Sequence, residues 1–427
     1  MTSSSLPRVL TIMGSGETAP TMVKTHRELI GRLDSPKPVL LDTPYGFQEN
    51  APELASRAVE YFNVSINTTI TPAGLVRMVG ADTIELQHGL NLLADANYVF
   101  AGPGSPTYAL RQWKGTPVPE SLHEKLRAGG IVTFASAAAL TIGTRTVPVY
   151  EIYKCGEDPY WLEGLNLLGD LGIPAVVIPH YNNAEGGHHD TRFCYLGEKR
   201  LQFLEKQLEG AEYVLGIDEH TGIVIDFDAG HAMVVGNGVV TLRVDGESRT
   251  YPTGEVLSLA ALQDPRAGHG AATKAESASA PTATPSSEPT VAPNSTPTSL
   301  RSSAEMHKTT FDDAMDSGDA IAATRAVLDL EADIKIWSAD TLTGTDSDFA
   351  RDTLRGMILK LGEAATSGLA DPREAVAPYV EAILEIRKIV RAEKRYDLSD
   401  IIRDALASAK VEVRDTPDGV EWVLQMP

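Results

Sequence analysis

The chain has 427 residues, more than one hydrophobic core usually organises, so two domains are expected. Hydrophobic residues make up 42% and charged residues 22%, the proportions of a folded, soluble protein. The formal net charge of −21 disfavours a broad electrostatic contact with nucleic acid or an anionic membrane. The two cysteines, Cys155 and Cys194, are too few for a disulfide framework and suit a reducing compartment. Because the N-terminus has no apolar signal segment and no run of about 18 apolar residues occurs, we expect a cytoplasmic protein.

Short apolar strands alternate with helical segments over the first half of the chain. The strands are predicted at Arg8–Met13, Pro38–Asp42, Tyr98–Ala101, Ile131–Phe134 and Ala175–Ile178. The helices are predicted at Glu53–Phe62, Ile84–Asn97 and Tyr195–Leu208, with one more after the glycine loop 102–104. This alternation indicates an α/β fold, a mostly parallel sheet with helices on both faces. Later strands are expected to add antiparallel strands at one edge of it, at Tyr213–Gly216, Ile223–Asp226, Ala232–Gly236 and Val239–Val244.

The composition changes between residues 263 and 304, where proline, alanine, serine and threonine replace almost all large apolar residues. Such a segment cannot bury a core, so we expect a disordered linker. The regular spacing of its prolines leaves a proline-motif ligand open. The linker separates an α/β domain at 1–262 from a helical domain at 305–427. Helices are predicted in the latter at Asp312–Trp337, Ser347–Ser367, Pro372–Glu393 and Leu398–Ala409, before a β-hairpin that turns at Asp418–Gly419.

The best candidate nucleophile follows the buried strand Ile131–Phe134. Ser136 stands before an alanine-rich helical start, the position of a nucleophile elbow, where a sharp turn exposes the hydroxyl. Its neighbours Ala135 and Ala137 are small, as a close strand–helix approach requires, whereas Phe134 stands where a glycine is usual. A serine after a strand is more often the N-cap of a helix, so that alternative stays open.

A serine nucleophile needs a base, and the base needs an orienting group. His180 follows the strand Ala175–Ile178, and open α/β sheets place their ligands at the carboxyl ends of strands. Glu151 or Glu185 could orient His180. Taken alone, each of these residues could equally be an ordinary loop histidine or a solvated carboxylate. Backbone amides could bind an oxyanion at three positions: Gly16, Gly104 and Ala137.

The loop after His180 collects ionisable groups that would gain little there unless they served a site. They are Glu185, His188, His189, Asp190 and Arg192. Arg192 could bind a substrate carboxylate in bidentate fashion, or it could pair with Asp190 as scaffolding. The histidines and carboxylates could also bind a metal ion, but neither H-E-x-x-H nor a comparable spacing is present. We therefore expect Glu185, Asp190 and Arg192 to contact substrate, with neither a metal ion nor a cofactor.

Residues 8–245 resemble the class I glutamine-amidotransferase-like fold, a flavodoxin-like architecture, and within it the cyanophycinase and dipeptidase E branch of serine peptidases. The shared features are G-S-G-E, F-A-G-P-G-S-P-T-Y-A-L, the elbow serine, the histidine after the next strand and V-L-G-I-D-E-H-T-G-I-V-I-D. The resemblance implies that Ser136 attacks an amide, that His180 is the base and that Glu151 orients it. The family's elbow usually reads G-x-S-A-G, and here it reads F-A-S-A-A. Amidotransferases proper have a cysteine at the elbow, so glutaminase activity is not expected.

Residues 305–427 resemble the C-terminal region of cysteinyl-tRNA synthetase. The matching runs are R-D-T-L-R-G-M-I-L-K-L-G-E-A, R-A-E-K-R-Y-D-L-S-D-I-I-R-D-A-L and D-T-P-D-G-V-E-W. The synthetase's nucleotide-binding motifs and zinc-binding cysteines are absent, so the chain is not expected to charge tRNA. One basic cluster, at 387–395, could contact RNA. Because the region holds 25 acidic and 15 basic residues, a structural role or contact with a protein is favoured.

The sequence thus predicts a serine-type peptidase or amidohydrolase that cleaves a peptide or isopeptide amide with Ser136, His180 and Glu151. The alternative is a non-catalytic binding or regulatory protein, and a metal-dependent hydrolase is the third possibility. The expected partners are a small peptide-like substrate and, through residues 305–427, tRNA or a protein. No membrane partner is expected, and a homodimer stays open.

Overall fold

The computed structural model of the chain describes residues 6–184, 189–267, 297, 299–337, 344–367, 372–416 and 419–425. It divides into two units. The first unit comprises residues 1–300 and 333–348, and the second unit comprises residues 301–332 and 349–427. Most of the predicted linker lies outside the described residues, and so do Glu185 and His188. What the sequence predicts for those positions therefore stays a prediction.

The larger sheet of the first unit has eight strands in the order β14-β11-β10-β1-β5-β4-β2-β3. Five strands pair in parallel: β1 (Arg8–Met13), β5 (Gly130–Ala135), β4 (Tyr98–Ala101), β2 (Pro38–Leu40) and β3 (Thr71–Pro72). Three strands continue it in antiparallel fashion: β10 (Thr221–Asp226), β11 (His231–Gly236) and β14 (Val256–Ser258). The predicted α/β fold with an antiparallel edge is confirmed.

Helices cover both faces of this sheet. Successive side chains of a strand point to opposite faces, so the apolar side chains of the central strands need cover on both sides. Leu10 and Ile12 of β1 belong to one core cluster, with residues of α3 (Thr83–Asp95) and α5 (Pro117–Ala128). Val9, which directly precedes Leu10, belongs to the opposite cluster, with residues of α1 (Val23–Ile30) and α2 (Ala51–Tyr61). The central strands are therefore apolar at nearly every position, as the sequence shows.

A second sheet of four strands accompanies the first, in the order β13-β12-β9-β8. Its strands are β8 (Ala175–Ile178), β9 (Tyr213–Ile217), β12 (Val239–Val244) and β13 (Glu247–Pro252). The prediction that all four later strands extend one sheet was wrong for two of them. β9 pairs in parallel with β8, and β12 pairs with β9, so only β10 and β11 join the edge of the larger sheet. The polar turn 218–220 carries the chain from one sheet to the other.

The remaining elements of the first unit are short. The helices are α4 (Pro106–Trp113), α6 (Ser136–Thr141), α7 (Val149–Tyr153), α8 (Gly197–Glu205) and α9 (Leu259–Gln263). β6 (Arg145–Thr146) and β7 (Leu162–Glu163) pair in antiparallel fashion on either side of α7. Single turns of helix lie at Pro20–Met22, Thr43–Tyr45, Phe62–Ile66 and Gly169–Leu171. Two of these helices, α4 and α6, begin at the glycine loop and at the candidate elbow.

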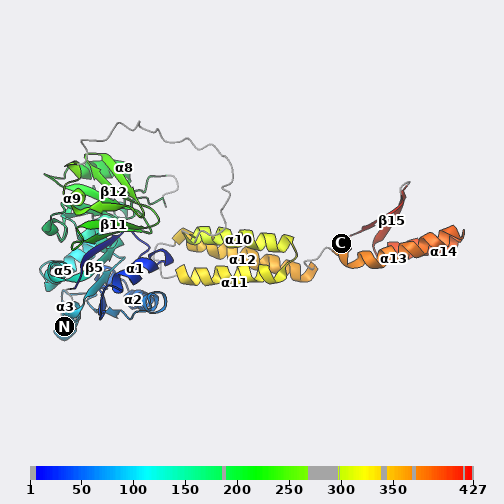
Figure 1. Cartoon of the computed structure of the whole chain (residues 1–427), viewed down its shortest axis with the longest axis horizontal. Coiled ribbons are helices and arrows are strands. Elements are labelled where there is room, and N and C mark those ends of the chain that lie inside the picture. The colour runs from blue at the N-terminus through cyan, green and yellow to red at the C-terminus, as the bar shows by residue number, and fades with distance from the viewer. Residues whose placement is uncertain are drawn as a thin grey trace. The chain divides into compact units, whose positions relative to one another are not determined.

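The C-terminal region is helical and ends in a hairpin (Figure 1). Its elements are α10 (Leu300–Asp316), α11 (Ala320–Ile336), α12 (Gly344–Ser367), α13 (Pro372–Ala392), α14 (Tyr396–Ser408), β15 (Val411–Thr416) and β16 (Gly419–Leu424). The single helix predicted for 312–337 is two helices, because Gly318 has φ +75° and breaks the helix after Asp316. Asp418 of the predicted turn lies outside the described residues.

The last helices and the hairpin share a small core of their own. Val380 of α13, Leu406 of α14 and Val411 of β15 are buried against one another, with Trp422 of β16 packed on them. None of the helices in the described ranges is both long and apolar enough to cross a membrane.

Candidate active site

The turn between β5 and α6 exposes a serine hydroxyl to a histidine ring. Ser136 has φ +49°, a left-handed conformation that is uncommon for any residue other than glycine and is found at functional sites. Its hydroxyl does not cap the helix, because Ala135 is the N-cap and no side chain accepts a capping hydrogen bond there. The Ser136 Oγ lies 2.9 Å from Nε2 of His180 instead. The geometry is that of a nucleophile with its base.

The residues that flank Ser136 allow this sharp turn. The amide of Ala138 donates to the carbonyl oxygen of Gly102 at 3.2 Å, so α6 starts close to the glycine loop. Phe134 is fully buried, and its ring lies 5.8 Å from that of Trp113 in the core. Its bulk therefore packs away from the elbow, and a glycine is not required at this position.

The chain also holds His180 in a left-handed conformation, with φ +49°. Pro179 separates it from β8, and the side chain of His180 is 5% exposed. Its carbonyl oxygen accepts hydrogen bonds from the amides of Asn183 and Cys194, at 3.2 and 3.1 Å. These bonds fix the backbone on both sides of the loop and aim the ring at Ser136.

The carboxylate beside His180 belongs to Glu219. Its Oε1 lies 3.0 Å from Nδ1 of His180, on the ring atom opposite to the one that faces Ser136. Neither carboxylate proposed from the sequence takes this place in the described residues. Glu151 accepts a hydrogen bond from the hydroxyl of Thr107 at 3.0 Å, because α7 packs toward the start of α4, and Glu185 lies outside the described residues.

A signal for Glu219 was present in the sequence. It stands in the turn that follows β9, and β9 pairs in parallel with β8, the strand that precedes His180. Parallel neighbours end at the same edge of a sheet, so their carboxyl-terminal residues meet. Without knowledge that β8 and β9 are neighbours, the D-E-H turn could not be connected to His180.

The surroundings of Glu219 favour its ionised form. Burial raises the pKa of Glu219, but hydrogen bonds from His180 and Asn183 and the nearby imidazoles lower it more, so its pKa lies below the ordinary value. Asp218 next to it behaves in the opposite way, because burial raises its pKa and the charge of Glu219 adds to this effect. An ionised Glu219 can hold one tautomer of His180 and stabilise the imidazolium.

The backbone positions expected to bind an oxyanion lie in tightly packed turns. Gly104 has φ +138°, and a Cβ there would approach the carbonyl oxygen of Pro44 to 2.1 Å. Gly16 has φ +64°, and a Cβ there would meet the ring of His220 at 2.1 Å. Ala137 lies in the first turn of α6, where amides have no acceptor within the helix. Side chains at both glycines would displace the loops that border the elbow.

Some of the charged side chains in the loop after His180 pair with one another. The guanidinium of Arg192 binds both carboxylate oxygens of Asp190, at 2.9 Å each, and lies 4.9 Å from the ring centre of Phe193. The same guanidinium holds the pKa of Asp190 well below its usual range. The ring of His189 stacks near Tyr153, with 6.4 Å between ring centres. Among the described residues, no group of three or more histidine, cysteine, aspartate or glutamate side chains could hold a metal ion.

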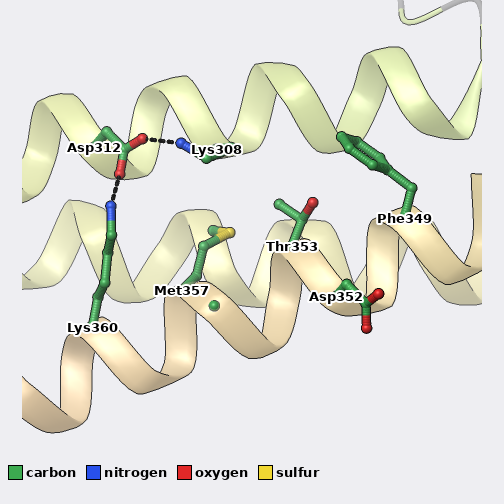
Figure 2. Close-up of a pocket in the computed structure, with 8 residues that line it drawn as sticks. Lys308, Asp312, Phe349, Asp352, Thr353, Met357 and Lys360 are labelled. Carbon is green, nitrogen blue, oxygen red and sulfur yellow. Dashed lines mark hydrogen bonds and ion pairs between the residues drawn. The ribbon is translucent and has the colours of Figure 1, made fainter.

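A separate cavity of about 340 Å³ lies in the second unit, between α10 and α12 (Figure 2). Figure 2 shows Asp312 reaching toward both Lys308 and Lys360, and Lys360 Nζ lies 2.7 Å from Asp312 Oδ1. The two lysines lower the pKa of Asp312. Phe349, Asp352, Thr353, Gly356 and Met357 complete the lining. These lining residues include no nucleophile paired with a base.

The basic cluster at 387–395 is also engaged within the second unit. Both ends of the Arg387 guanidinium bind Asp415, at 2.8 and 3.0 Å, and Arg391 binds the same carboxylate at 2.6 Å. The Arg387 side chain is 3% exposed. Two of the arginines therefore hold α13 to β15, and contact of this cluster with RNA stays a prediction.

Solved structures similar to this chain are peptidases. A peptidase from an acI-B1 Actinobacterium is 22% identical and covers 60% of this chain and 98% of its own, with a TM-score of 0.49. A protein from Listeria monocytogenes EGD-e assigned to peptidase E is 14% identical and covers 58% of this chain and all of its own, with a TM-score of 0.37. No family model matches the chain.

Curated relatives match another part of the chain and are cysteine–tRNA ligases. The ligase of Cereibacter sphaeroides is 33% identical over 114 residues, which are 26% of this chain and 21% of the ligase. The ligase of Salinibacter ruber is 36% identical over 112 residues, which are 24% of this chain and 21% of the ligase. The chain thus spans about a fifth of the length of these relatives.

Proposed function

We propose that the first unit is a serine hydrolase that cleaves a peptide or isopeptide amide, with Ser136, His180 and Glu219 as its catalytic groups. One observation carries the proposal: a continuous hydrogen-bonded row from Ser136 Oγ through both ring nitrogens of His180 to Glu219 Oε1. All three residues lie at turns that follow strands of the two sheets. The strain at Ser136 and His180 supports the proposal, because strained backbone persists where surrounding structure holds it for a function.

The proposed reaction begins when the Ser136 hydroxyl attacks the carbonyl carbon of the amide while His180 Nε2 accepts its proton. Glu219 stays ionised and stabilises the resulting imidazolium. Backbone amides at Gly104 and Ala137 are proposed to donate to the oxyanion. His180 then returns the proton to the leaving amine nitrogen as the C–N bond breaks, which leaves an ester on Ser136. Water, activated by His180, hydrolyses this ester and restores the serine.

The residues that we propose to bind substrate lie in the loop after His180. Asp190 and Arg192 form an ion pair at the start of α8, and Arg192 keeps donors beyond the two that Asp190 uses. We assign this pair, together with Glu185, to recognition of charge on a small peptide-like substrate. The assignment concerns affinity only, because the hydrogen-bonded row does not include these residues.

The test is covalent labelling of the full chain with a fluorophosphonate probe, which reacts with activated serines. The wild type is expected to be labelled at Ser136, and Ser136→Ala is expected to lose all labelling. Ser56→Ala is the matched control, because Ser56 lies in α2 and donates to the carbonyl oxygen of Pro52. Absence of labelling in the wild type, or equal labelling of Ser136→Ala, would overturn the proposal.

A further inference from the structure

The catalytic carboxylate is held by two consecutive asparagines that the triad itself does not require. Asn183 Nδ2 donates to Glu219 Oε1 at 3.1 Å, the same oxygen that faces His180. Asn182 Oδ1 accepts a hydrogen bond from the backbone amide of Glu219 at 2.8 Å. The turn after β9 is therefore fixed at its backbone by one asparagine and at its carboxylate by the next.

Asn183 connects the two halves of the site. Its side chain is fully buried and reaches Glu219, while its backbone amide donates to the carbonyl oxygen of His180 at 3.2 Å. Burying an amide side chain is unfavourable unless it is hydrogen-bonded, so a buried asparagine at this point needs a reason. One residue thus fixes the backbone of the base and the side chain of the carboxylate that orients it.

We propose that Asn183 is a positioning residue, which holds Oε1 of Glu219 in line with Nδ1 of His180 and selects for the ionised carboxylate. This inference rests on the proposed hydrolase function. Only a donor satisfies the geometry, because Glu219 Oε1 is an acceptor when ionised. Aspartate has nearly the shape of asparagine but no donor, and it would place a second negative charge against Glu219.

Other titratable groups also face Glu219 and enter any pH dependence of the site. They are His180 on the loop after β8, Asp218 and His220 on the same turn, and Cys194 on the loop before α8. A second carboxylate at position 183 would favour the protonated form of each of them, because negative charge stabilises a bound proton. The acid side of the pH profile therefore reports directly on position 183.

The experiment measures the second-order rate constant for fluorophosphonate labelling of the full chain across a pH series, in the wild type, Asn183→Ala and Asn183→Asp. Asn183→Ala removes the donor and is expected to lower the rate constant about 10- to 100-fold, as small misplacements of catalytic groups do. Asn183→Asp is expected to lower it as well. It should also raise the pH at which labelling is half-maximal on the acid side by about one pH unit.

A purely structural role predicts lower thermal stability without a change in that pH. Asn97→Asp is the matched control, because Asn97 hydrogen-bonds the backbone of Lys37 and Ser35 at the amino end of β4. The pH profile of this variant should equal that of the wild type. A wild-type rate and pH profile in Asn183→Asp would overturn the positioning role and leave the proposed function standing. Failure of the wild type to label would remove the proposed function and this inference together. Asn183→Asp is nearly isosteric, so it decides the matter even where Asn183→Ala does not fold.

Discussion

The two units of this chain use polar side chains in opposite ways. In the first unit, Ser136, His180 and Asn183 are buried and hydrogen-bonded to one another or to Glu219. In the second unit, several charged side chains lie at the surface and pair with neighbours on the same helix or strand, as Arg355 does with Asp352. Surface pairs of that kind are weak, whereas buried polar groups are unfavourable unless the structure satisfies them. The difference fits the proposal that the first unit carries the catalytic groups.

The apolar side chains show the same contrast. The first unit buries large residues such as Trp113 and Phe134 completely, on the faces of its larger sheet. In the second unit, α13 and α14 leave Tyr379 and Ile401 more than half exposed. Their small shared core is built from few residues, chiefly Val380, Leu406 and Val411. The second unit therefore has less hydrophobic area with which to offset the entropy of folding.

The largest expected effect comes from a comparison of two carboxylates in the first unit, Glu219 in the hydrogen-bonded row and Glu151 outside it. Glu219→Gln is expected to lower the rate of labelling or hydrolysis about 10³- to 10⁴-fold, because loss of the charge leaves His180 in the wrong tautomer. Glu151→Gln should change the rate by no more than a few-fold, since Glu151 bonds Thr107 rather than His180. Rate constants of both variants at neutral pH decide between them. A larger loss for Glu151→Gln would return the orienting role to the residue that the sequence first suggested.

How much of this site the sequence could predict depends on how far apart along the chain the contacting residues lie. Ser136 and His180 each follow a strand whose apolar residues mark it clearly, so both could be chosen from the sequence, although their strands belong to different sheets. Glu219 could not, because its place depends on the pairing of β9 with β8, which no local pattern reveals. The division into two sheets escaped prediction for the same reason. The helix break at Gly318 was missed because helical periodicity continues on both sides of it.

A second prediction concerns a histidine that takes no part in the proposed chemistry. His26 is fully buried in the first unit among four aromatic rings, and it hydrogen-bonds Tyr98 and the carbonyl oxygen of Glu17, both at 2.7 Å. Burial lowers the pKa of His26 to about 4. The unfolded chain takes up this proton near pH 6.5, whereas the folded chain does so only near pH 4. His26 therefore does not lower the free energy of unfolding above pH 6.5, and it lowers that free energy increasingly as pH decreases toward 4. The loss attributable to His26 should reach roughly 3 kcal/mol.

Urea unfolding of the wild type and His26→Gln, followed from pH 7 to pH 4.5 or so, checks this expectation. His26→Gln keeps hydrogen-bonding capacity without a titrating ring, so its stability should fall less over this range. His231→Gln is the control, because His231 is exposed on β11 and its replacement should leave the slope unchanged. Equal slopes in the wild type and His26→Gln would contradict the prediction.

The smallest expected effect lies in the second unit and tests whether its charges serve only its own structure. Arg387 and Arg391 bind Asp415 and hold the pKa of that carboxyl well below its usual range. The stabilisation that the ionised Asp415 provides is therefore fully present above the ordinary aspartate pKa of about 4. It is lost as pH falls below about 4 and through the lowered pKa of Asp415 in the folded state. Asp415→Asn should cost about 1 kcal/mol at pH 7, a modest figure because the Asp415 side chain is 44% exposed. The difference from the wild type should shrink in acid.

Glu412→Gln removes an ion pair between neighbouring side chains of one strand, since Arg414 is 60% and Glu412 42% exposed. It should have no measurable effect, which makes it the matched control for Asp415→Asn. Unfolding is followed by circular dichroism in urea, and fluorophosphonate labelling is measured on the same samples. Labelling of Ser136 should be equal in all of them, because neither carboxylate belongs to the hydrogen-bonded row at the elbow. If Asp415→Asn slowed labelling while Glu412→Gln did not, the charges of the second unit would have to act on the reaction, and the separation of roles between the two units would be wrong.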